Sequence, residues 1–206
     1  MNAIIISALL GVVMMFSGIF TTNKLVIKNI ALLCLGVLLL GNLADATGFF
    51  VIDVDTKGML AFTKYGLFFN TLIIAATFLY VLISGSDIVK VGNYSAEYFA
   101  LIFFVLCGIS ILTSFNTLLM MFLGIEIMSI PLYILTGSDK KNLKSNEASL
   151  KYFLMGAFST GIMLMGIALL YGASGNFGIE LIGKSQTSPL LKVPILEVIG
   201  LLFVLV

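Results

Sequence analysis

Long apolar runs dominate this chain of 206 residues and limit what it can fold into. A helix rises about 1.5 Å per residue, so about 20 mostly apolar residues span the roughly 30 Å hydrocarbon core of a bilayer. The sequence holds six such runs, at about Ala3–Phe20, Leu25–Ala44, Gly66–Ser84, Tyr98–Ser114, Asn116–Thr136 and Leu150–Tyr171. A seventh run opens at Ile195 and is still apolar at Val206, so we expect a fragment that stops in mid-span. The pattern predicts an all-α membrane protein, a multi-span bundle of transmembrane helices.

Composition supports the bilayer and excludes several function classes. Apolar residues make up 60% of the chain and charged residues 10%, whereas a soluble domain has roughly a quarter charged residues. The net charge of +1 gives no dense basic face, so we expect no nucleic-acid partner. Histidine is absent, and Cys34 and Cys107 lie far apart in apolar runs. These facts exclude imidazole metal sites and Ser-His or Cys-His catalysis, and we expect neither a metal nor a cofactor in this chain.

Two stretches match the letters of soluble ligand-binding motifs. GIELIGKS, at Gly178–Ser185, fits the phosphate-binding pattern, but that motif works between a buried strand and a helix. DVDTKG, at Asp53–Gly58, begins like a calcium loop but has Lys57 at its fifth position and Lys64 at its twelfth. We interpret the first as a chance resemblance and the second as an ordinary solvated turn.

The lysines predict an orientation, because basic residues are retained on the cytoplasmic side. Loops one-two, three-four and five-six hold six lysines, and the other side holds four. This bias predicts an outside N-terminus and a cytoplasmic KKNLK loop at Lys140–Lys144.

Glu126 is the first candidate site residue, since it lies about 15 Å from either end of the run Asn116–Thr136. A charge at that depth costs around 2.5–3.5 kcal/mol, so we expect it to face protein or water rather than lipid. Helical spacing places Ser129 and Tyr133 on the same face. Pro131 removes a backbone N–H beside the carboxylate, which favours a kink with trapped water. The alternative is a protonated glutamate that only hydrogen-bonds a neighbouring helix.

Lys151 is the second candidate, and we expect it about one turn inside the sixth run. Ser145 or Asn146 would cap that helix, and Glu147 would complement its positive end. Lys151 either lines an entry route that leads to Glu126 or reaches the cytoplasmic headgroups with its flexible stem. Glu126 would lie roughly 10 Å deeper, which favours a water-bridged path over a direct ion pair.

Two stretches carry a family resemblance. EYFALIFFVLCGISILTSFNTLLMMFLGIEIMSIPLYILTG (97–137) and NEASLKYFLMGAFSTGIMLMGIALLYGASG (146–175) closely resemble the subunit N family of bacterial NADH:quinone oxidoreductase, respiratory complex I. Within them, EASLKYF (147–153) and LYGASG (170–175) favour subunit N over its paralogues M and L and over the multisubunit cation/proton antiporters. The first three runs match only in hydropathy.

The resemblance implies a bundle of about fourteen helices with two inverted repeats, each of which contains a broken helix. Residues 1–96 would form three N-terminal helices, and residues 97–206 would begin the first antiporter-like repeat. The family's proton-translocating glutamate and lysine correspond to Glu126 and Lys151. A further lysine on the broken seventh helix would lie beyond Val206, so this stretch could not pump alone.

The resemblance also implies an assembly in the bacterial inner membrane. We expect partner subunits M, K, J, A and H, with NADH, flavin, iron–sulfur clusters and quinone bound by partner subunits. This chain has no Rossmann fingerprint and no cysteine run, so it would be a subunit of a redox-driven translocase without redox-active residues. The alternatives are a subunit of a multisubunit cation/proton antiporter and a bundle that only scaffolds its neighbours.

Overall fold

The chain folds into helices that agree with the predicted runs. The computed structural model describes residues 1–21, 23–48, 55–91, 95–179 and 194–205. In this part of the chain, six helices are long and apolar enough to cross a membrane, which confirms the predicted fold class. The helices are α1 (Asn2–Phe20), α2 (Lys24–Thr47), α3 (Lys64–Val91), α4 (Ser95–Leu112), α5 (Leu118–Thr136), α6 (Leu143–Ser174) and the shorter α7 (Pro194–Leu205).

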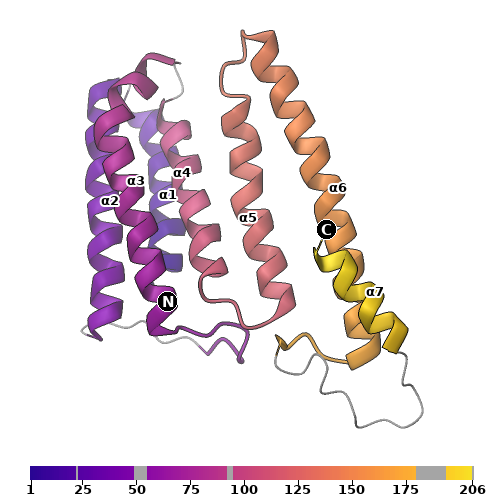
Figure 1. Cartoon of the computed structure of the whole chain (residues 1–206). Coiled ribbons are helices and arrows are strands. Elements are labelled where there is room, and N and C mark those ends of the chain that lie inside the picture. The colour runs from indigo at the N-terminus through magenta and orange to yellow at the C-terminus, as the bar shows by residue number, and fades with distance from the viewer. Residues whose placement is uncertain (22, 49–54, 92–94, 180–193, 206) are drawn as a thin grey trace.

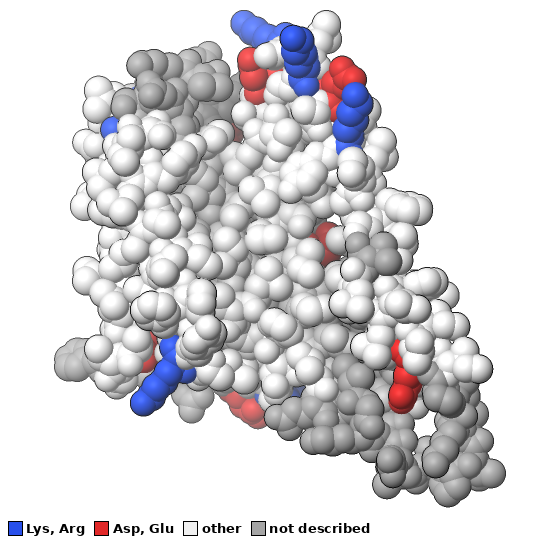
Figure 2. Space-filling view, in the orientation of Figure 1, with Lys and Arg blue, Asp and Glu red and all other residues white. Residues whose placement is uncertain are grey.

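The long helices stand side by side, and successive helices are joined at alternate ends of the bundle (Figure 1). Figure 2 shows that charged side chains gather at the two ends, with a broad uncharged band between them. Acidic atoms recessed at mid-height interrupt this band on the face shown. Charges and connecting segments at two surfaces, with apolar side chains between, are the arrangement that a multi-pass membrane protein requires.

Helix α6 begins earlier than the sequence suggested. Its N-cap is Asn142, whose side chain accepts a hydrogen bond from the backbone N–H of Lys144 at 3.0 Å. The expected caps, Ser145 and Asn146, lie inside the helix instead. Ser145 donates its hydroxyl to the carbonyl of Thr136 at 2.8 Å, so it serves the end of α5. The prediction of the cap was wrong because this tertiary partner competes for the serine side chain.

Two apolar clusters hold the bundle together. The larger one unites α1, α2, α3 and α4 around the buried rings of Phe99 and Phe103. The smaller one joins α5, α6 and α7 through Leu118, Ile167 and Leu170. The packing therefore groups α4 with the three helices before it, while α4 also contacts α5.

Helices α4 and α5 cross at two glycines. A Cβ built on Gly108 would lie 2.6 Å from the backbone nitrogen of Met128 and 2.9 Å from the carbonyl oxygen of Gly124. Only glycine allows two backbones to approach so closely. The crossing ties the larger cluster to the helix that carries Glu126.

Extended segments connect helices at the end of the bundle where α5 begins. Leu60 pairs with Phe115 and Thr117 pairs with Gly178 as isolated antiparallel bridges. Residues 180–185 of the GIELIGKS stretch and residues 53–54 of DVDTKG lie outside the described residues. Lys184 and Lys192 lie there too, so the orientation drawn from the lysines stays a prediction.

Candidate functional site

The candidate site is a polar stripe on α5. Glu126, Ser129 and Tyr133 recur every three or four residues, so they lie on one face of this helix. Ser129 and Tyr133 are each 8% exposed, and Glu126 is half-buried. The prediction that these three residues share a face is confirmed.

Tyr133 shows that the stripe faces α6. Its ring packs edge-on against Tyr152, with centroids 4.8 Å apart, and against Phe153, with centroids 5.8 Å apart. Its hydroxyl lies against Gly156, at the place where any larger residue would put a Cβ. Ser149 donates its hydroxyl to the carbonyl of Tyr133 at 2.9 Å. Residues of α6 therefore surround Tyr133. The rest of the stripe lies along the line of contact between the two helices, which we call the α5–α6 seam.

The residues next to Glu126 on α5 offer few hydrogen-bonding groups to its carboxyl group. Ser129 donates its hydroxyl to the carbonyl of Ile125 at 2.6 Å, one turn back on the same helix. Pro131 is buried, and α5 continues through it as one helix. Because proline lacks an N–H, the carbonyl of Ile127 has no backbone donor four residues on. That carbonyl is available to a water molecule or to a side-chain donor.

Glu126 itself makes no hydrogen bond or ion pair with any other residue in the described part of the chain. A carboxyl group inside an apolar bundle is costly when it is charged and unpaired. It can take up a proton, bind water, or pair with a cationic group that approaches. The first two of these would let it hold or pass on a proton in mid-membrane.

Lys151 lies elsewhere. Its ammonium pairs with Glu147 one turn away at 2.5 Å, and the two side chains are 69% and 63% exposed. It is the ninth residue of α6, so it stands two turns into the helix rather than one, because the helix begins at Leu143. Five residues separate it from Gly156, which turns it about 140° away from the α5-facing side. The structure therefore does not bring Lys151 and Glu126 together.

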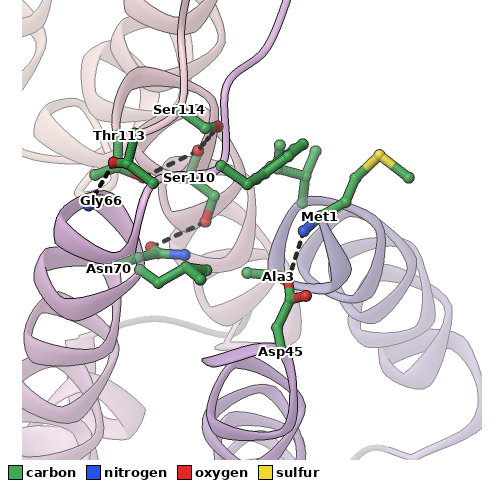
Figure 3. Close-up of a pocket in the computed structure, with 12 residues that line it drawn as sticks. Met1, Ala3, Asp45, Gly66, Asn70, Ser110, Thr113 and Ser114 are labelled. Atoms are coloured by element: carbon green, nitrogen blue, oxygen red, sulfur yellow. Dashed lines mark hydrogen bonds and ion pairs between the residues drawn. The ribbon is translucent and has the colours of Figure 1, made fainter. Parts of the chain in front are cut away.

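A buried chain of hydrogen bonds joins three other helices, and sequence reasoning missed it. Asn70 of α3 donates its amide to Asn42 of α2 at 3.2 Å. It also accepts the hydroxyl of Ser110 of α4 at 3.1 Å (Figure 3). Asn42 also donates to Thr71 at 2.7 Å. Asn42, Asn70 and Ser110 are each at most 3% exposed. The signal was available, since Asn42 and Asn70 are amides within predicted spans.

A small pocket lies next to this chain of hydrogen bonds, at the end of the bundle where α1 begins. Its wall includes Asp45, whose carboxylate binds the amino group of Met1 at 2.5 Å (Figure 3). The same carboxylate accepts the backbone N–H of Asn2 at 3.1 Å. The charge of Asp45 is therefore compensated by the start of α1. Among the described residues, no group of three His, Cys, Asp or Glu side chains could hold a metal ion.

Comparison with known proteins places this bundle in a family. The family model described as NADH:quinone oxidoreductase/Mrp antiporter, TM, matches residues 114–206. NADH-quinone oxidoreductase subunit N of Cytophaga hutchinsonii is 40% identical over 188 residues, which are 91% of this chain and 40% of that protein. The chain belongs to the antiporter-like membrane-subunit family. The resemblance read from residues 97–137 and 146–175 is thereby confirmed.

Other members of the antiporter-like family give the same picture. Subunit N of Flavobacterium johnsoniae is 37% identical, over 98% of this chain and 42% of its own length. The chain thus spans about two-fifths of the length of these curated relatives. Its fold matches respiratory complex I from Thermus thermophilus with a TM-score of 0.70 and 26% identity, over 98% of this chain and 42% of the other. The archaeal membrane-bound sulfane sulfur reductase shares the fold, with a TM-score of 0.77 and 20% identity.

Proposed function

We propose that this chain is the N-terminal part of subunit N of a proton-pumping NADH:quinone oxidoreductase, in which Glu126 holds or controls a proton in mid-membrane. The observation that carries the proposal is the half-buried carboxyl group on the α6-facing stripe of α5, which has no partner among the described residues. The subunit N relatives and the complex I fold match support the assignment. Ser129, Pro131 and Tyr133 would support Glu126 by fixing its helix against α6.

Lys151 has a different place in this proposal. Its exposed pair with Glu147 suits a group that collects protons near one membrane surface. Contact with Glu126 would then run through water or through groups of the longer protein. Residues 1–96 would form the supporting helices, and residues 97–206 would begin the antiporter-like repeat.

The whole protein would act as one subunit of a redox-driven translocase in the bacterial inner membrane. Its partners would include subunits M, K, J, A and H, which together with the peripheral arm would bind NADH, flavin, iron–sulfur clusters and quinone. This chain would contribute the membrane-spanning path for the proton.

A subunit of a multisubunit cation/proton antiporter is the second candidate, because the matching family model covers the Mrp antiporters as well. The two functions differ in what drives transport. The first predicts proton movement that depends on NADH oxidation. The second predicts exchange of sodium for protons in vesicles that receive no NADH.

The test is proton pumping in inverted membrane vesicles that carry the full-length protein with Glu126→Gln. Glutamine keeps the size of the side chain and removes its charge. We expect an assembled complex with lost pumping, measured alongside electron transfer. Glu97→Gln is the matched control, since Glu97 is an exposed acid in the first turn of α4, and it should pump normally. Normal pumping by Glu126→Gln would refute the assignment.

A further inference from the structure

The packing of α5 against α6 fixes which α6 residue lies level with Glu126. At one end of the seam, Ser145 binds the carbonyl of Thr136 and the ring of Tyr133 lies among the α6 residues 152–156. At the other end, Leu118 packs against Met163, Ile167 and Leu170. The two helices therefore run antiparallel in a single register along their length.

Glu126 lies seven residues before Tyr133 in α5, which is about 10 Å along the helix axis. The same step along α6, taken from the centre of the residues that touch Tyr133, ends at residues 160–161. Thr160 is four residues from Gly156, so it stays on the side of α6 that faces α5. Gly161 has no side chain and Ser159 is exposed, so Thr160 is the half-buried polar residue at this level.

Thr160 has a hydroxyl that can serve Glu126. It is half-buried, and its Oγ1 donates to the carbonyl of Ala157 at 3.3 Å, a long local bond within α6. A hydroxyl oxygen also accepts hydrogen bonds, and its hydrogen can rotate. The two hydroxyls of the α5 stripe are less suited to bind Glu126. Ser129 donates its hydroxyl to the carbonyl of Ile125 at 2.6 Å, and the hydroxyl of Tyr133 lies a further turn away, at Gly156.

We propose that Thr160 becomes the hydrogen-bond partner of Glu126 across the α5–α6 seam in the full-length protein, although the described structure contains no bond between them, and that it positions the carboxyl group for proton transfer. A protonated Glu126 donates to Oγ1 of Thr160, while the threonine keeps its bond to Ala157. An ionised Glu126 accepts the threonine hydrogen, which leaves the carbonyl of Ala157. Thr160 thus offers a partner in both protonation states, and it is a positioning residue rather than a proton carrier.

The role of the contact rests on the proposed function, whereas the contact itself does not. Infrared difference spectra of the purified, full-length complex isolate the carboxyl or carboxylate band that Glu126→Gln removes. We expect Thr160→Val, which keeps the shape and removes the hydroxyl, to shift this band, and Thr160→Ser to restore it. Thr77→Val is the control, because Thr77 makes the same kind of local bond within α3, to Ile73 at 2.9 Å.

Pumping in vesicles gives the second reading. Thr160→Val should lower the proton-pumping rate about threefold, the factor equivalent to about 0.6 kcal/mol for one interhelical hydrogen bond in a membrane. Thr160→Ser should pump normally. An unshifted band in Thr160→Val, or an equal shift in Thr77→Val, overturns the proposed contact. If Glu126→Gln pumps normally while Thr160→Val still shifts the band, the contact stands and the proposed function fails.

Discussion

Substitution of Gly156 should destabilise the fold for a steric reason, because the absence of a side chain at this position makes room for Tyr133. A Cβ added at Gly156 would overlap the hydroxyl of Tyr133 and would lie 2.6 Å from its Cζ and 3.0 Å from its Cε1. Tyr133 is 8% exposed and is held between Tyr152 and Phe153, so its ring cannot step aside without moving them. Gly156→Ala must therefore push α5 and α6 apart at this point.

The size of the effect follows from two opposing terms. Overpacking a filled site costs typically about 1–3 kcal/mol. Alanine in place of a helical glycine recovers up to about 1 kcal/mol of helix propensity. Gly161→Ala supplies the reference, because nothing lies within 4 Å of a Cβ built there. The difference in unfolding free energy between the two variants isolates the steric term, and we expect about 1–3 kcal/mol.

Equilibrium unfolding of the full-length subunit in mixed detergent–SDS micelles measures this difference. A Tyr133→Leu background removes the atoms that meet the added Cβ, so there Gly156→Ala should behave like Gly161→Ala. The separate cost of Tyr133→Leu cancels in the cycle. If Gly156→Ala is as stable as Gly161→Ala with Tyr133 in place, the seam is looser than described and the register argument for Thr160 loses its anchor.

Three further predictions use the same unfolding assay. Asn70→Leu breaks two interhelical hydrogen bonds, each contributing roughly 0.6–1.7 kcal/mol, and should destabilise the subunit by about 1–3 kcal/mol. No measurable loss of stability would mean that the buried chain of hydrogen bonds is not formed. Gly108→Ala should be more harmful than Gly156→Ala, because its Cβ meets backbone atoms that no rotamer change can move, and equal stability would contradict the close α4–α5 crossing. Lys151→Met should change stability by no more than about 0.5 kcal/mol, since exposed pairs contribute little, while a fall in pumping would support its role as a proton collector.

The sequence predicted the helices and the polar stripe because both follow from local periodicity. Six spans and the shared face of Glu126, Ser129 and Tyr133 depend only on hydropathy and on 3.6 residues per turn. The start of α6 could not be read in the same way, because Asn142, Ser145 and Asn146 are all good caps. The choice depended on Thr136, which binds the hydroxyl of Ser145 and lies nine residues earlier in the chain.

The contacts between helices could not be predicted from the sequence either. Asn42 and Asn70 each look like an isolated polar residue near the end of an apolar run. Only the packing of α2, α3 and α4 brings them together with Ser110. Likewise, the proposed pairing of Thr160 with Glu126 follows from the antiparallel register of α5 and α6, which the contact of Tyr133 with Gly156 shows.

The difference between the two parts of the bundle bears on how a proton site can work. In α1–α4 the buried amides and the carboxylate of Asp45 have their partners, and fully satisfied polar networks in a low-dielectric interior stiffen a fold. Glu126 stands two residues from the glycine crossing that joins α5 to this stiff part, yet it lacks a partner among the described residues. Its backbone is thus held firmly while its carboxyl group is left to exchange partners. A carboxyl group with fixed position and changeable bonds can respond to its charge state without unfolding its surroundings, which is what proton transfer in mid-membrane requires.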